Sequence, residues 1–155
     1  MNIFSPYEVD MEELLANQES WDIFATKFIN LPLNIKNVLS PSSTSDYLKY
    51  LSENLNLNND QSAELSRIIR DVLLGDLFIG EMPQNISDRM KLPPDEAKKV
   101  GNLIVSELFG PAIEDIKKLQ VEKFPEKINK PIHEKPDLKI EPGINKNNIV
   151  DLRNK

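Results

Sequence analysis

Residues 55–75 and 90–110 repeat one pattern at a constant offset of 35 residues. The two segments, LNLNNDQSAELSRIIRDVLLG and MKLPPDEAKKVGNLIVSELFG, align without a gap. The clearest identical pairs are Leu57 with Leu92, Asp60 with Asp95, Ile69 with Ile104, Leu73 with Leu108, and Gly75 with Gly110. These are aliphatic positions, an acid near a helix start and a glycine after the last apolar pair. The repeat therefore predicts how a helical core is built and leaves the function open.

Each repeat unit is predicted to be a short helix, a tight turn and a longer helix. In the first unit a helix over about residues 45–55 precedes Asn58 and Gln61, whose spacing is typical of a helix-capping box. In the second unit Pro83 starts one helix, and Pro93-Pro94 starts the next, where a missing N–H is harmless. The apolar stripes of the longer helices follow a 3.6-residue period: Leu65, Ile68, Ile69, Val72 and Leu73 in one, and Val100, Leu103, Ile104, Leu108 and Phe109 in the other. Gly75 and Gly110 are expected to stop them.

Five shorter segments complete the predicted body. Ser5-Pro6-Tyr7-Glu8 reads as a capping box that starts a helix over about residues 6–16. A helix over about residues 20–29 carries Trp21, Phe24, Ala25, Phe28 and Ile29 on one face, which is expected to fill the core. A short helical turn follows Leu31-Pro32, and the serine-rich residues 40–45 are expected to form a loop. Pro111 is expected to open the last helix of the body.

The fold class that follows is all-α. The period is close to the 34 residues of tetratricopeptide repeats, but the Trp-Leu-Gly-Tyr and Ala-Phe-Pro pattern of that family is missing. Two units are also fewer than the roughly three that a solenoid needs. We therefore expect a compact multi-helix bundle over residues 1–123, in which helical hairpins of about residues 45–75 and 83–110 pack together. A groove is expected between the two hairpins.

Residues 124–155 differ in composition from the body. They hold prolines at positions 125, 131, 136 and 142, which interrupt any helix, and they have no aromatic residue after Phe124. Such a segment is predicted to be a disordered, partly polyproline-like tail. Near its end lies a cluster of three aliphatic side chains within Ile149, Val150, Asp151, Leu152 and Arg153. One interpretation is a short docking motif that adds to a partner's groove or sheet edge; the other is that it packs on the protein's own body or has no role.

The composition disfavours several function classes. The chain has no cysteine, and its single histidine, His133, lies between prolines in the tail. No catalytic or metal-binding motif is present, so we expect no enzyme activity and no cofactor. The N-terminus lacks a secretion signal, and no apolar run approaches the roughly 18 residues that span a bilayer. The expected location is cytoplasmic, with no membrane contact.

The net charge is −6, and residues 1–123 alone hold 12 Lys/Arg against 20 Asp/Glu. Such an acidic body repels phosphates and disfavours nucleic acid as a partner. The leading hypothesis is accordingly a non-catalytic protein-interaction or adaptor module with an unknown protein partner. The alternative is a DNA-binding or nucleoid-associated helical protein that would use Arg67 and Arg70. A carboxylate-based metal enzyme is a third, weaker hypothesis, and homodimerisation stays open because a second copy can cover an apolar groove.

Five short features together resemble a group of small helical proteins from host-associated bacteria of the candidate phyla radiation. They are Leu31-Pro32, Leu74-Gly75, the Pro-Asp-Glu-Ala helix start at Pro94–Ala97, the segment Leu108–Pro111, and the terminal Val-Asp-Leu-Arg at Val150–Arg153. The resemblance covers most of the chain. It implies a helical fold and transfers no site, because no activity is established for that group.

Overall fold

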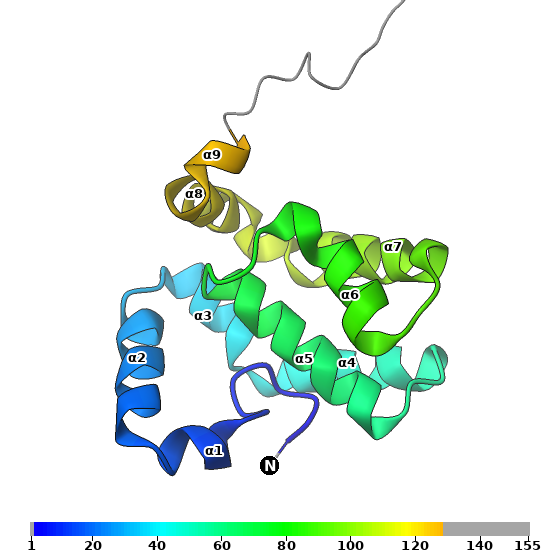
Figure 1. Cartoon of the computed structure of the whole chain (residues 1–155), viewed down its shortest axis with the longest axis horizontal. Coiled ribbons are helices and arrows are strands. Elements are labelled where there is room, and N and C mark those ends of the chain that lie inside the picture. The colour runs from blue at the N-terminus through cyan, green and yellow to red at the C-terminus, as the bar shows by residue number, and fades with distance from the viewer. Residues whose placement is uncertain (1, 129–155) are drawn as a thin grey trace, which may run out of the picture. The chain divides into compact units, whose positions relative to one another are not determined.

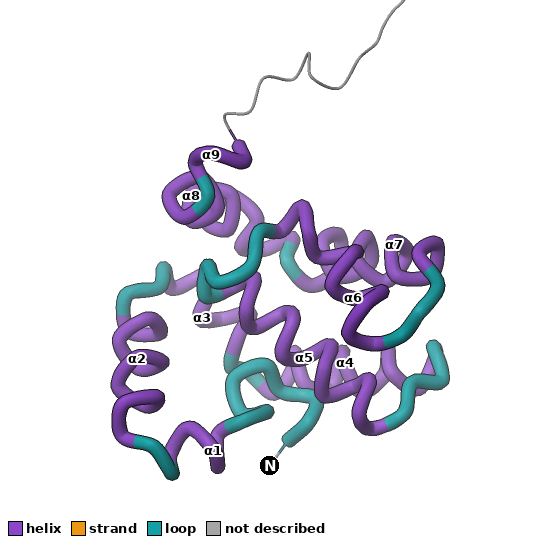
Figure 2. The backbone as a smooth tube through the Cα atoms, viewed as in Figure 1, coloured by secondary structure: helices purple, strands orange, loops and turns teal. Residues whose placement is uncertain are grey.

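A computed structural model describes residues 2–128 of the chain. The chain divides into a first unit of residues 1–123 and a second unit of residues 124–155. The described residues are all-α, with helices joined by turns and loops and no strand among them (Figure 2). The α-helices of the first unit are α1 (Met11–Leu15), α2 (Gln18–Ile29), α3 (Leu33–Leu39), α4 (Ser42–Asn54), α5 (Asn59–Leu73), α6 (Met82–Met90), α7 (Pro94–Leu103) and α8 (Ile113–Lys123).

Three short segments of other helical type interrupt this order. They are the 3-10 turns Ile79–Glu81 and Gly110–Ala112 and the π-helical segment Ile104–Leu108, which continues α7. In the second unit the described residues contain α9 (Pro125–Ile128), so the predicted disordered tail is wrong for these residues, where Pro125 takes the first helical position. Between residues 2 and 128, no helix has the length and apolar character that crossing a bilayer requires.

Helix α5 is the central element of the first unit. In Figure 1 it lies between α2 and α3 on one side and α6 and α7 on the other. Its predicted stripe is confirmed, because Leu65, Ile68, Ile69, Val72 and Leu73 are all 0–1 % exposed. The stripe of the second unit is also confirmed, with Val100, Ile104, Leu108 and Phe109 buried and Leu103 half-buried. Burial of these side chains supplies the main driving force for folding.

The repeat is preserved in the backbone of the two turns as well as in the sequence. Asn56 and Lys91, 35 positions apart, are the non-glycine residues of the described chain with positive φ, at 55° and 58°. Each is followed by a leucine whose N–H donates to the carbonyl five residues earlier: Leu57 to Ser52 at 2.9 Å and Leu92 to Ser87 at 3.2 Å. This is the Schellman pattern, in which a left-handed residue ends one helix and the next residue packs back against it.

The two longer helices start as predicted but end differently. The capping box of α5 is confirmed, because the Asn58 side chain accepts from the Gln61 N–H and the Gln61 side chain accepts from the Asn58 N–H. Gly75 has φ +82° and is the predicted left-handed helix stop. The helix before Gly110 also ends as predicted, at Leu108, but Gly110 is not left-handed and begins a separate 3-10 turn. The second unit instead widens to π-helical bonding, in which the Phe109 N–H donates to the Ile104 carbonyl at 2.9 Å.

The predicted first helix over residues 6–16 is wrong for its first half. Residues 6–10 form turns, and the helix begins only at Met11. Ser5 does accept a hydrogen bond from the Glu8 N–H at 3.2 Å, but Asp10 leaves the helical region, with φ −123°. The cause is tertiary: Val9 is completely buried, and the Asp10 carboxylate binds two arginines of α5.

The serine-rich segment 40–45 is another correction, because it is not a loop. Helix α4 begins at Ser42, directly after the extended Pro41, and the Thr44 hydroxyl donates to the Val38 carbonyl at 2.6 Å. The serines therefore form the first turn of a helix that composition alone marked as a break. The segment is helical because Pro41 stands directly before the first helical residue and because the buried Thr44 bonds to α3. These two features outweigh the loop preference of the serines.

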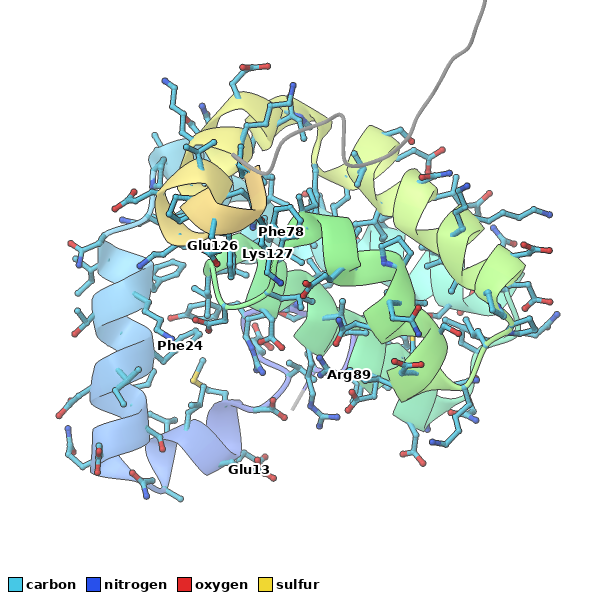
Figure 3. All side chains as sticks on the ribbon, turned by 45° about the horizontal axis from the view of Figure 1, so that its top comes forward. Glu13, Phe24, Phe78, Arg89, Glu126 and Lys127 are labelled. Atoms are coloured by element: carbon cyan, nitrogen blue, oxygen red, sulfur yellow. The ribbon has the colours of Figure 1, made fainter. Side chains whose placement is uncertain are left out.

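The aromatic face of α2 is only partly as predicted. Phe24 is 5 % exposed and lies on the side of α2 toward the rest of the unit (Figure 3). Its ring packs between those of Tyr7 and Trp21, at centroid distances of 5.5 and 6.0 Å. Trp21 is only half-buried, and Ile29, expected on the inner face, is 68 % exposed. Helix α2 therefore closes the core through Phe24 rather than through its whole apolar face.

Candidate functional site

A groove lies between the two repeat units, where the sequence predicts one. It encloses about 210 Å³ and is lined by Leu55, Leu57, Leu92, Glu96, Lys99, Val100 and Leu103. Most of these side chains are aliphatic. They come from α7 and from the two turns that precede α5 and α7.

The repeat itself positions the leucines of this groove. Leu57 and Leu92 follow the left-handed residues of the two turns, so the same local geometry presents both at the same place in their units. Both are half-buried and pack against the core at their inner ends. Val100 is 2 % exposed and forms the floor, whereas Leu55 is 37 % exposed at the edge. The groove is thus an extension of the core that reaches solvent.

Two residues of opposite charge stand at the edge of the groove. Glu96 and Lys99 are exposed and lie three residues apart on α7, so their side chains leave the helix from neighbouring positions. Within the described part of the chain, neither side chain makes an ion pair or a hydrogen bond. An aliphatic floor with a charged edge is typical of sites that bind a peptide segment.

A second feature is a cluster of six charged side chains on α5 and its neighbours. Asp10 accepts from Arg67 at 3.0 Å and from Arg70 at 2.8 Å. Glu64 accepts from Arg67 at 2.6 Å and from Arg89 at 2.9 Å, so that Arg89, labelled in Figure 3, ties α6 to α5. The sixth residue is Asp71, which lies 3.4 Å from Arg89 and 3.6 Å from Arg70.

The carboxylates of this cluster differ in the direction in which their pKa is shifted. Burial raises the pKa of Asp10, but its hydrogen bonds and charge interactions with Arg67 and Arg70 outweigh this and hold the pKa below its usual value. The pKa of Glu64 is lowered in the same way by Arg67 and Arg89. Burial raises the pKa of Asp71, and its two more distant arginines do not compensate. The cluster therefore fastens residue 10 and α6 to α5, with Asp71 as its weakest member.

Arg67 and Arg70 are the residues on which the DNA-binding alternative depends. Both side chains are bound to carboxylates of the same chain and are only 29 % and 16 % exposed. A phosphate contact would require them to leave Asp10 and, for Arg67, also Glu64. Their geometry therefore favours a structural role and supplies no positive surface for nucleic acid.

A larger cavity of about 350 Å³ lies beside this cluster, between α2 and α5. Part of its charged lining is paired internally, with Lys27 bound to Asp76 at 2.8 Å and Asp10 bound to Arg70, whereas Glu13 also lines the cavity outside these pairs. Within residues 2–128, no three His, Cys, Asp or Glu side chains are grouped so that they could hold a metal ion. The cavity thus carries four carboxylates, Asp10, Glu13, Asp71 and Asp76, against the two cations Lys27 and Arg70.

The predicted docking residues Ile149, Val150, Asp151, Leu152 and Arg153 lie outside the described residues, and so does the whole segment from residue 129. Glu96 and Lys99 were not singled out from the sequence, because charged residues on a helix usually form a solvated face. The sequence signal that points to the groove is the identical pair Leu57 and Leu92, because each leucine stands before a longer helix rather than within its apolar stripe.

The chain matches no protein-family model, no curated protein and no solved structure.

Proposed function

We propose that residues 1–123 form a non-catalytic protein-interaction module that binds a short segment of a partner in the groove between the two repeat units. The observation that carries the proposal is the pair Leu57 and Leu92, held half-buried by identical turns around the floor at Val100. Residues 149–153 are proposed as a second, docking contact of the same module.

The dimensions of the groove support a peptide ligand over a small molecule. Its volume of about 210 Å³ is below the roughly 300–1,000 Å³ that is usual for small-molecule pockets. It is open along one side, because Leu55 and the edge residues Glu96 and Lys99 are exposed. A peptide can place a few aliphatic side chains on the floor while its backbone stays in water.

Site-specific photo-crosslinking tests the groove. A benzoyl-phenylalanine replaces Leu55 in the full chain, and in a control chain it replaces Leu33, which is 70 % exposed on α3 and lies outside the groove. We expect position 55 to crosslink a defined protein that position 33 does not reach, and Lys99→Glu to weaken that crosslink. The same set of crosslinked proteins at both positions would contradict the proposal.

The docking contact has its own test. Deleting residues 146–155 removes the aliphatic cluster and leaves every described helix intact. We expect the helical circular dichroism signal to stay unchanged while capture of the partner is lost. Undiminished capture by the shortened chain would rule out residues 149–153 as a docking contact.

A further inference from the structure

The groove and residues 149–153 have complementary chemistry. The groove has an aliphatic floor, and the segment carries Ile149, Val150 and Leu152. The groove edge carries Glu96 and Lys99, and the segment carries the opposite partners, Arg153 and Asp151. Complementary charge around an apolar contact is the pattern that fixes the orientation of a bound peptide.

The spacings also agree. In an extended peptide, alternate side chains point to opposite sides, so Val150 and Leu152 share the face that can enter the groove. In that bound form Asp151 and Arg153 would share the other face, directed away from the groove floor and about 6.6–6.8 Å apart, where only long side chains at the groove edge can reach them. Neighbouring side chains three residues apart on a helix, such as Glu96 and Lys99, are separated by about 5–6 Å between their Cβ atoms.

This match defines a direction for the segment. When Asp151 lies next to Lys99 and Arg153 next to Glu96, the segment runs antiparallel to α7. Exposed ion pairs contribute little to affinity, so their role is to select this direction over the reverse one. The aliphatic contacts with Leu57, Leu92 and Val100 supply the attraction.

We propose that the groove binds residues 149–153 of a second copy of the chain. The inference rests on the proposed function of the groove and names its partner. Residues 124–148 separate the body from the segment and carry prolines at positions 125, 131, 136 and 142, each of which fixes its own backbone φ and stiffens the chain locally. Such a spacer favours the groove of another copy over that of the same chain. The contact is heterologous, because each copy offers a groove to one neighbour and a segment to another.

Sedimentation velocity of full-length variants tests the inference by complementation. Leu152→Asp disables the segment and keeps the groove, whereas Leu55→Arg disables the groove and keeps the segment. Wild type is expected to associate as its concentration rises, with a dissociation constant on the order of 100 µM because few side chains are buried. Each variant alone is expected to stay monomeric, and their equimolar mixture to form one-to-one pairs that grow no further.

Two further variants test specificity. Lys99→Glu places a like charge against Asp151 and is expected to weaken association by roughly two- to fivefold, and adding Asp151→Lys is expected to restore it. Leu33→Arg, an exposed leucine outside the groove, is expected to associate as wild type does. Circular dichroism of each variant checks that the helical fold is kept.

A wild-type chain that stays monomeric up to about 1 mM would overturn the inference, and so would a mixture of the two disabled variants that does not pair. Both results would also arise if the segment bound only the groove of its own chain. A crosslink from position 55 to a different protein, together with a monomeric chain, would keep the proposed function and remove only the second copy as the partner. A crosslink from position 55 to this chain itself, together with one-to-one pairing, would support both.

Discussion

Asp10 and Asp71 of the charged cluster are expected to differ in what replacement by asparagine does to the stability of the fold. Asp10→Asn removes the charge that accepts hydrogen bonds from Arg67 and Arg70 at 2.8–3.1 Å. Asp71→Asn removes a charge whose nearest arginine nitrogens are 3.4 and 3.6 Å away. The first substitution is therefore expected to destabilise the fold, and the second to leave it unchanged or to stabilise it at neutral pH.

The magnitude follows from the contacts of Asp10. Hydrogen bonds to charged groups contribute about 1.5–3 kcal/mol each, and the amide keeps part of them, so Asp10→Asn is expected to cost about 2–3 kcal/mol. The Asp10 side chain is only 15 % exposed, which limits screening by solvent. For a domain of this size about 1 kcal/mol shifts the melting temperature by roughly 3–5 °C. Asp71→Asn is expected to change stability by less than about 1 kcal/mol, because burial already disfavours its charge.

The pH dependence follows from the same shifts. The lowered pKa of Asp10 means that its contribution is present above the unfolded value of about 3.8 and is lost as the pH falls through the lower folded value. The raised pKa of Asp71 has the opposite effect, since its cost at neutral pH is relieved on acidification. Thermal unfolding followed by circular dichroism at pH 7 and in steps to pH 3 measures both. The reasoning is refuted if Asp71→Asn destabilises more than Asp10→Asn at pH 7, or if the effect of Asp10→Asn does not shrink in acid.

Four further substitutions test the packing of the first unit by chemical denaturation. Gln120→Leu is expected to cost about 1–3 kcal/mol, because the buried Gln120 side chain accepts from the Ile79 N–H at 2.8 Å and that donor would be left unpaired. Gly75→Ala is expected to cost about 1–2 kcal/mol, because φ is +82° there. Ser87→Ala is expected to cost about 1 kcal/mol through the lost bond at 2.8 Å to a backbone carbonyl, whereas Ser52→Ala should cost less, since that buried hydroxyl has no partner among residues 2–128. Equal losses for the two serines would contradict this account.

The sequence predicted the elements whose causes are local. The capping box of Asn58 and Gln61, the apolar stripe of α5 and the left-handed Gly75 depend on residues within a few positions of one another. The same holds for the groove, because Leu57 and Leu92 are placed by the turns that directly precede them. The gapless repeat in the sequence is therefore enough to predict both turns.

The errors have causes that are distant in the sequence. The helix start at Ser5 does not continue because Asp10 is held by arginines 57 and 60 residues further along the chain. The serine-rich segment is helical because Thr44 bonds to α3. Gly110 does not end its helix in the left-handed way of Gly75, because the second unit ends in a π-helical segment that the first unit lacks. Periodicity and composition carry no information about any of these contacts.

The central claim is that the groove between the repeat units binds a peptide. The most direct measurement is a titration of the methyl-labelled full chain with a synthetic peptide of residues 145–155, followed by ¹H–¹³C NMR. The account predicts saturable shifts of the methyl signals of Leu57, Leu92 and Val100, with no change at Ile69, which is buried in α5 away from the groove. Shifts that are absent, that do not saturate, or that spread equally over the core would contradict it.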